Sequence, residues 1–285
     1  MCGIVGISAE NNVVGDLYDS LLMLQHRGQD SAGMVVCDSE GKLNSRKSMG
    51  YVRDTFLQRH MNKLVGNYGI GHVRYPTAGG DGKEFAQPMY VNSPYGISLA
   101  HNGNLTNSES LANELFHAEM RHLNTDSDSE VLLNIFAHEL GKQREIYPEA
   151  KHIFKAVAKT HRRCDGAYAV IALITGFGLL AFRDNNGIRP LVIGIRKGKN
   201  RDEYMISSEN AAFASLGFET LRDVEPGGRY LSTIKEYFIH NNVRKFFRKD
   251  HASLSMFILQ DQTQPLIKFQ FINQECVWAN GWLIK

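Results

Sequence analysis

The residue best placed to do chemistry is a cysteine at position 2, directly after the initiator methionine. Cysteine is small enough for Met1 to be removed, and removal would leave Cys2 with a free α-amino group. Nucleophile and base would then lie on one residue, because a thiol titrates at about 8.5 and an α-amine at about 7.7–8.0. The amine can accept the thiol proton directly or through one water. A processed terminus with a buried structural cysteine is the alternative interpretation of this stretch.

A thiolate that attacks an amide builds a tetrahedral oxyanion, which needs fixed hydrogen-bond donors. Asn102 offers a side-chain amide and Gly103 a backbone N–H that no side chain crowds. Asn-Gly is also the strongest short hairpin signal, so a turn is the alternative at this position.

Two charged residues suit the two ends of an amino acid. Arg74 can hold a carboxylate with a two-point fork, and Asp128 can pair with an α-ammonium. Asp128 also fits a second role, as an acid stabilised at the N-terminus of a helix. His72 and His101 are interpreted as structural hydrogen-bonding residues, since the α-amine already supplies a base.

Composition sets few limits on function. The chain has 285 residues, 43% of them hydrophobic and 22% charged, with a net charge of +2. This balance favours no nucleic-acid or membrane partner. Its four cysteines lack paired C-x-x-C spacing, so neither a disulfide framework nor a zinc site is indicated. No secretory signal is evident, and the longest apolar run, 168–182, is too short to span a bilayer. We therefore expect a cytoplasmic protein.

Apolar periodicity predicts helices and strands in segregated blocks, which is typical of an α+β fold with layered sheets and outer helices. The helix at 127–140 begins with a capping-box pattern, Ser127 to Glu130. The strand at 97–101 is expected to stop before Asn102. The expected helices are 16–25, 108–118, 127–140 and 151–162, and the expected strands are 4–7, 33–37, 69–73, 97–101, a hairpin over 168–182, 191–195, 203–207 and 229–231.

Five motifs in order resemble the glutaminase domain of the amidophosphoribosyltransferases (glutamine phosphoribosylpyrophosphate amidotransferases). They are Cys2-Gly3-Ile4, residues 25–33 (QHRGQDSAG), 71–79 (GHVRYPTAG), 100–105 (AHNGNL) and 127–130 (SDSE). The resemblance runs from Met1 to about Gly228. The related domains of the hexosamine-forming aminotransferase and of asparagine synthetase differ at Gln29, at Tyr75-Pro76 or after Gly28.

The resemblance implies a four-layer αββα N-terminal-nucleophile (Ntn) hydrolase fold, with two stacked antiparallel sheets between helical layers. It implies that Cys2, Asn102 and Gly103 are catalytic and that glutamine is the substrate. Residues that bind glutamine would be Arg27, Arg74, Thr77 and Asp128. No metal or other cofactor is implied for this chain. A catalytically idle regulatory or scaffold module is the alternative, and the intact set of residues argues against it.

The family's second half is a phosphoribosyltransferase domain, whose nucleotide-binding loop has no counterpart here. We expect residues 1–235 to be the glutaminase domain and 236–257 to start a connection to the missing domain. The chain would hydrolyse glutamine at best, since phosphoribosylpyrophosphate and Mg²⁺ would bind only through that domain. The resemblance also implies a homo-oligomer.

The tail at 258–285 has no family resemblance, and we predict that it is frame-shifted. Codons permitted for 258–271, read one frame over, encode Phe-Ala-Arg-Pro-Asp-Ser-Thr-Ile-Asp-Lys-Val-Ser-Val, which resembles the family's junction into the missing domain. The tail should therefore have no packed role. Resequencing the locus through the Phe257 codon decides the matter, and a clean read with no transferase-coding frame downstream would refute the idea.

Overall fold

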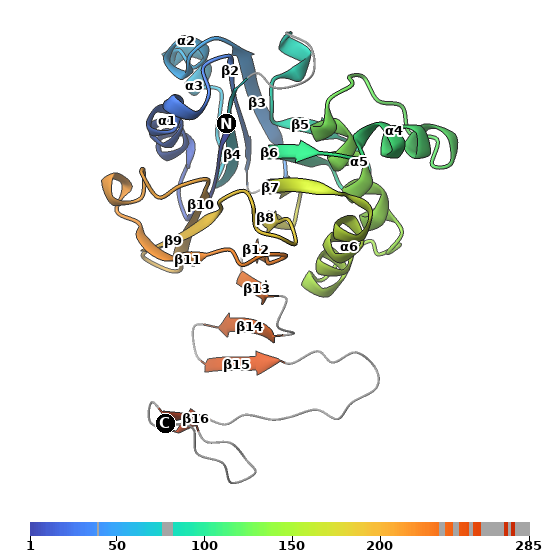
Figure 1. Cartoon of the computed structure of the whole chain (residues 1–285). Helices are drawn as coiled ribbons and strands as arrows, with labels where there is room; N and C mark the ends of the chain where they lie inside the picture. Colours follow the sequence, from blue (N-terminus) through green and yellow to red (C-terminus); the bar gives the residue numbers. More distant parts are fainter. Residues whose placement is uncertain are drawn as a thin grey trace, which may run out of the picture.

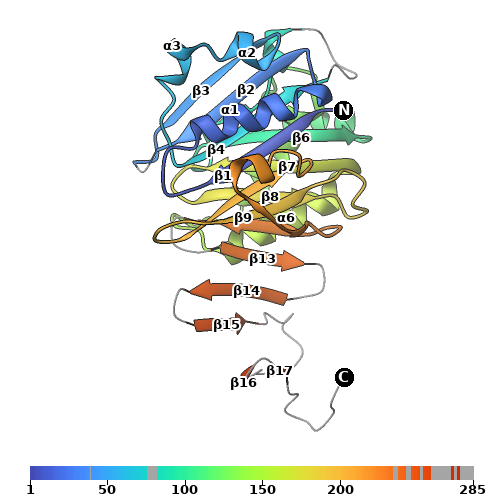
Figure 2. The ribbon, with the colours of Figure 1, turned by 90° about the vertical axis from the view of Figure 1, so that its left-hand side faces the viewer.

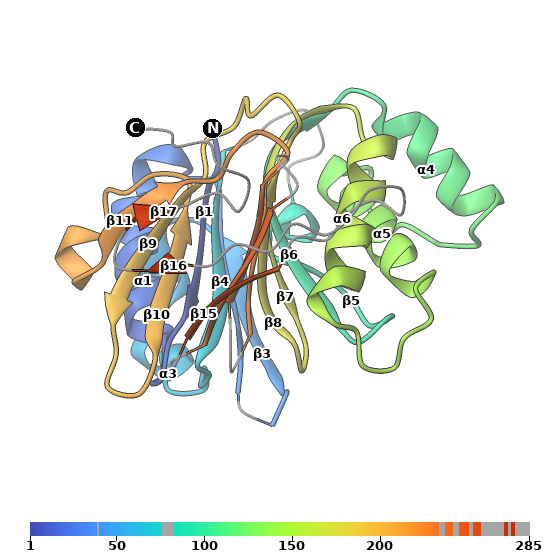
Figure 3. The same ribbon diagram turned by 90° about the horizontal axis from the view of Figure 1, so that it is seen from below.

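Two antiparallel β-sheets stack face to face, and helices cover the outer side of each sheet (Figures 1 and 3). The computed structural model describes residues 1–38, 40–75 and 82–233, together with the backbone of five short strands further along. The expected αββα arrangement of two antiparallel sheets between helical layers is confirmed, and the α+β class with it.

The first sheet has seven strands in the order β11-β9-β10-β1-β4-β2-β3. Its central strand, β1, is the N-terminal strand, hydrogen-bonded to β4 on one side and β10 on the other. The strands are β1 (Gly3–Ser8), β2 (Ser31–Cys37), β3 (Leu43–Met49), β4 (Tyr68–Arg74), β9 (Val192–Lys197), β10 (Asp202–Ser207) and β11 (Glu219–Asp223).

The second sheet has eight strands in the order β15-β14-β13-β12-β8-β7-β6-β5. Strands β13, β14 and β15 extend the sheet away from the helical layers (Figure 2). The strands are β5 (Met89–Val91), β6 (Ile97–Leu105), β7 (Gly166–Ile174), β8 (Gly178–Arg183), β12 (Arg229–Ser232), β13 (Tyr237–Asn241), β14 (Lys245–Asp250) and β15 (Ser253–Phe257). A separate pair is formed by β16 (Phe271–Ile272) and β17 (Glu275–Cys276).

Helices on the two outer faces differ in length. The first sheet is covered by α1 (Val14–Met23), with the short α2 (Val52–Thr55) and α3 (Gln58–Met61) beside it (Figure 2). The second sheet is covered by α4 (Ser108–His117), α5 (Asp128–Gly141) and α6 (Ala150–Arg163). Three 3₁₀ turns complete the set: η1 (Gln25–Arg27), η2 (Lys83–Phe85) and η3 (Ala214–Leu216).

Strand β1 is buried on both faces, which explains its near-continuous apolar sequence. Val5 and Ile7 pack with α1, while Ile4 packs between the two sheets. Burying each such side chain stabilises the fold by about 1.5–3 kcal/mol. Cys2, the candidate nucleophile, therefore precedes a strand that is hydrogen-bonded along both edges and packed on both faces.

Two expectations about local structure were wrong, and one edge strand was missed. Strand β6 does not stop at Asn102 but runs through Asn102 and Gly103 to Leu105, paired with β7 along its length. Ser127 caps α5 as expected, but Glu130 accepts from Asn124 and Thr125 rather than from the Ser127 N–H. The edge strand β3 was not predicted, because its sequence lacks an apolar alternation.

Two sequence-based expectations lie outside the described residues. Thr77 is not described, and of the 258–285 tail only the backbone of β16 and β17 is described. Within the described part of the chain, no helix is long and apolar enough to cross a membrane.

Two glycines provide a test of how tightly β2 packs. A Cβ on Gly33 would overlap the carbonyl oxygen of Gln87, whereas a Cβ on Gly15 in α1 would meet nothing within 4 Å. We expect Gly33→Ala to lower the free energy of unfolding by about 1–3 kcal/mol, because backbone must shift. Gly15→Ala should raise it by up to about 1 kcal/mol. Urea unfolding measures the free energy of unfolding of both variants. Equal changes in the two would contradict the close packing of Gly33 against Gln87.

Candidate active site

The Cys2 side chain lies at the N-terminal end of β1 and is 9% exposed. The backbone N–H of Tyr75 donates to Cys2 Sγ over 3.4 Å, and the thiol faces the Tyr75 carbonyl oxygen at 3.7 Å. The Cys2 carbonyl oxygen accepts from Arg27 Nε at 3.0 Å. Both the main chain and the sulfur of Cys2 are thus held in place.

Burial raises the pKa of the Cys2 thiol above its ordinary value. The Tyr75 backbone N–H, the chain's α-ammonium and Arg74 each lower this pKa, and Asp128 raises it, but burial has the largest effect. The thiol is therefore protonated at neutral pH, and a base is needed before Cys2 can attack a substrate. Arg74 and Asp128 are thus the two side-chain charges that influence the Cys2 thiol most among the described residues.

Asn102 and Gly103 lie on β6, which faces β1 and β4 across the space between the sheets. Ala100, on the same face of β6, packs in one cluster with Ile4 and Ile70. Asn102 shares this face and is 1% exposed, and its Nδ2 has no hydrogen-bond partner among the described residues. Such a buried donor without a partner is costly unless a ligand satisfies it.

Gly103 has φ +155°, and a Cβ there would overlap the carbonyl oxygen of Ala167 on β7. A side chain at this position would therefore push β6 away from β7. The glycine of the Asn-Gly pair allows β6 to lie close to β7. The hairpin-turn interpretation is therefore wrong.

Arg74 ends β4 with its guanidinium inside the fold, where Nη1 forms an ion pair with Asp30 Oδ2 at 2.8 Å. The guanidinium also lies over the ring of Phe85, 5.3 Å from its centroid. Both side chains of the ion pair are mostly buried, at 7% and 15% exposed. Asp30 and Phe85 therefore fix the orientation of the Arg74 fork.

Asp128 is the first residue of α5, and its Oδ2 accepts from the Leu105 N–H at 3.0 Å. This bond ties the start of α5 to the end of β6, two residues after Gly103. The Asp128 side chain is 20% exposed. It is thus both a helix N-terminal acid, as the alternative interpretation had it, and a charge near Cys2.

A buried network of polar side chains holds β6 at His101. Gln87 Oε1 accepts from the His101 N–H at 2.7 Å, and Gln87 Nε2 donates to Ser129 Oγ at 3.0 Å. Ser129 Oγ also lies 2.9 Å from His101 Nδ1, and His72 Nε2 lies 3.2 Å from the His101 carbonyl oxygen. Burial lowers the pKa of His72 to about 3 and also lowers that of His101. Both rings are neutral and structural, in agreement with the sequence interpretation.

Sequence reasoning missed several residues of this site. Asp30 stands in the 25–33 motif and Gln87 lies within the stretch of family resemblance, but their partners Arg74 and His101 are distant in sequence. Glu209 forms an ion pair with Arg27, and the segment around it resembled the family without any chemical signal. These contacts join residues that are far apart in the sequence, so they become evident only in the folded chain.

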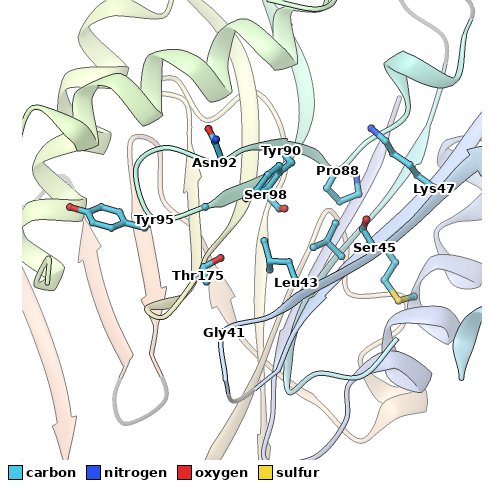
Figure 4. Close-up of a pocket in the computed structure, with 13 residues that line it drawn as sticks. Gly41, Leu43, Ser45, Lys47, Pro88, Tyr90, Asn92, Tyr95, Ser98 and Thr175 are labelled. Carbon is cyan, nitrogen blue, oxygen red and sulfur yellow. The ribbon is translucent and has the colours of Figure 1, made fainter. Parts of the chain in front are cut away.

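A cavity lies elsewhere, between the edges of the two sheets (Figure 4). It has a volume of about 570 Å³, and the view shows Ser98 and Thr175 facing Leu43 and Ser45 across it. None of the predicted site residues that the structure describes lines this cavity. Among the described residues, no cluster of His, Cys, Asp or Glu could hold a metal ion.

A terminal thiol, an unpartnered amide donor and opposite charges at one place suit attack on a side-chain amide of an amino acid. Comparison with known proteins agrees. Residues 77–215 match a family described as a glutamine amidotransferase domain. Over 227 residues the chain is 59% identical to an amidophosphoribosyltransferase of Pseudomonas aeruginosa, with 80% of this chain and 45% of the relative covered. The Escherichia coli enzyme of the same name is 57% identical over 228 residues, with the same coverage.

Solved structures give the same result. The glutamine phosphoribosylpyrophosphate amidotransferase of B. subtilis superposes with a TM-score of 0.70 at 33% identity, covering 84% of this chain and 49% of that one. A structure titled as the allosteric regulatory enzyme of purine biosynthesis gives 0.72 at 34% identity, with the same coverage.

Fold and site together define a glutamine amidotransferase domain. The matched part of the chain belongs to the amidophosphoribosyltransferase family, as the resemblance implied. The chain spans about half the length of the curated relatives that it matches.

Buried neutral histidines make stability depend on pH. His161, 2.8 Å from the Tyr168 hydroxyl, resembles His72 in that burial lowers its pKa to about 3. Below the unfolded value of about 6.5 the unfolded chain binds a proton that the folded chain does not. The free energy of unfolding should therefore fall as pH drops from about 6.5 toward 3, by about 1.4 kcal/mol per pH unit for each such histidine.

Urea unfolding at stepped pH checks this. His161→Gln should reduce the slope between about pH 6 and pH 4 by roughly 1.4 kcal/mol per pH unit. His117→Gln, at an exposed position on α4, is the matched control and should leave the slope unchanged. An unchanged slope in His161→Gln would show that His161 is charged in the folded protein.

Proposed function

We propose that this domain hydrolyses glutamine to glutamate and ammonia, with Cys2 as the nucleophile. The observation that carries the proposal is the buried Nδ2 of Asn102, which has no hydrogen-bond partner in the described part of the chain and lies on the strand that faces the Cys2 end of β1. A donor held there without a protein partner is suited to an oxyanion that exists only during reaction.

Removal of Met1 starts the mechanism, because it frees the α-amine of Cys2. The amine accepts the thiol proton, and the sulfur attacks the side-chain amide carbon of glutamine. The carbonyl oxygen becomes an oxyanion, which accepts hydrogen bonds from Asn102 Nδ2 and from the Gly103 backbone N–H. Each such donor typically contributes about 10²–10³ in rate.

Collapse of the tetrahedral intermediate breaks the carbon–nitrogen bond. The amide nitrogen takes the proton from the α-ammonium and leaves as ammonia, and a thioester remains on Cys2. Water then attacks the thioester carbon, with the α-amine accepting its proton. The thiol is restored and glutamate leaves.

Recognition of glutamine is assigned to the charged residues. Arg74, held by Asp30, binds the α-carboxylate, and Asp128 binds the α-ammonium. Thr77 and Arg27 complete the set by resemblance. The contacts of Arg27 with Cys2 and Glu209 support a role in holding the nucleophile.

The wider function follows the relatives. We infer that residues 1–235 are the glutaminase part of an amidophosphoribosyltransferase, which passes ammonia to phosphoribosylpyrophosphate in the committed step of purine synthesis. Phosphoribosyl transfer and Mg²⁺ binding need the part of the relatives that this chain does not span. A cytoplasmic location, a homo-oligomer and a frame-shifted tail at 258–285 stay predictions.

Glutamate release by the purified chain tests the proposal. We expect Cys2→Ala to abolish glutamine hydrolysis and keep the fold, because it removes the nucleophile and few packing atoms. Cys164→Ala, at another buried cysteine, is the control and should retain activity. Mass spectrometry should show that Met1 is absent. Glutamate release by Cys2→Ala, or an active protein that retains Met1, would exclude the mechanism.

A further inference from the structure

The end of β10 and the residue that follows it are hydrogen-bonded to β1 near the start of the chain. Ser208 Oγ accepts from the Ile4 N–H at 3.0 Å, and the Ser208 N–H donates to the Ile4 carbonyl oxygen at 3.0 Å. Ser207 Oγ donates to the same carbonyl oxygen at 3.3 Å. All three residues are fully buried, so water does not compete for these bonds.

The next residue, Glu209, reaches Cys2 through Arg27. Glu209 Oε1 lies 3.4 Å from Arg27 Nη1, and Arg27 Nε donates to the Cys2 carbonyl oxygen at 3.0 Å. The Arg27 side chain is only 10% exposed. Among the described residues Arg27 forms an ion pair with no other carboxylate, so Glu209 supplies the counter-charge that a mostly buried guanidinium needs.

We propose that Glu209 is a positioning residue for the Cys2 nucleophile, which it aligns by holding the Arg27 guanidinium against the Cys2 carbonyl. This inference rests on the proposed glutaminase function and extends it to a residue that does not touch glutamine. Ser208 fixes the strand at Ile4, and the Glu209–Arg27 pair fixes the last flexible peptide before the thiol.

Loss of Glu209 has two distinct effects under this arrangement. Arg27 loses an anchor, so the thiol is presented in the wrong place more often, and displacements of about 1 Å can cost up to 10²-fold in rate. Arg27 also loses its counter-charge. The net positive charge near Cys2 rises and favours the thiolate, which shifts the pH profile of thiol reactivity to lower pH.

Glu209→Gln keeps the shape and removes the charge. We expect kcat for glutamine hydrolysis to fall about tenfold while KM changes less than about twofold, since the proposed glutamine contacts of Arg74 and Asp128 are intact. Alkylation of Cys2 by iodoacetamide, followed on the Cys2 peptide by mass spectrometry, should show its midpoint at lower pH than in the unsubstituted protein. Glu209→Asp should restore part of kcat.

Control variants separate this path from general damage. Glu209 Oε1 also pairs with His26 Nε2 at 2.8 Å, so His26→Gln tests that contact alone and should behave as the unsubstituted protein. Glu219→Gln, an exposed acid on β11, matches the charge change. On an Arg27→Met background, Glu209→Gln should lower kcat no further, because the contact through which Glu209 positions Cys2 is gone.

The outcomes are decisive. An unchanged kcat and alkylation midpoint in Glu209→Gln, or a loss of kcat that persists in full on Arg27→Met, would overturn the positioning role. The alkylation measurement uses no glutamine. If the unsubstituted protein released no glutamate, the glutaminase proposal would fail, while the alkylation profiles would still test the link from Glu209 to Cys2.

Discussion

The site depends on one constraint, the placement of the N-terminal strand in the middle of a sheet. Strand β1 is hydrogen-bonded on both edges and packed on both faces, so the chain terminus cannot fray as termini commonly do. Cys2 is the first residue beyond this fixed strand. The position of its sulfur is therefore set by the strand register, and little conformational entropy remains to be lost when a substrate binds.

Burial that fixes the thiol also keeps it unreactive. Desolvation raises the Cys2 pKa, and the nearby charges of Arg74 and Asp128 act in opposite directions. The buried imidazoles of His72 and His101 are neutral and engaged in hydrogen bonds, so neither is poised as a base. Under the proposed mechanism the α-amine supplies the base, which makes the chemistry depend on removal of Met1.

Sequence patterns predicted much of this architecture. The buried β1, the long helices and the 168–182 hairpin follow from apolar periodicity, and family motifs supplied the site residues. The end of β6 was predicted wrongly, because the local Asn-Gly preference yields to pairing with β7 at Gly103. Strand β3 was missed because its inward positions include Ser45 and Lys47, which face a cavity rather than a core. The contacts Arg74–Asp30 and Arg27–Glu209 join distant segments, and single-sequence patterns carry no such information.

The bond between Ile4 and Ser208 spans 204 residues of sequence, which has a consequence for the order of events during synthesis. The first strand leaves the ribosome long before its partner β10 exists. At about 5–20 residues per second, roughly 10–40 s pass before the two can pair. Throughout that interval Met1 is accessible and the cysteine behind it has no pocket. Removal of Met1, which the proposed mechanism requires, can therefore precede the folding of β1 into the sheet.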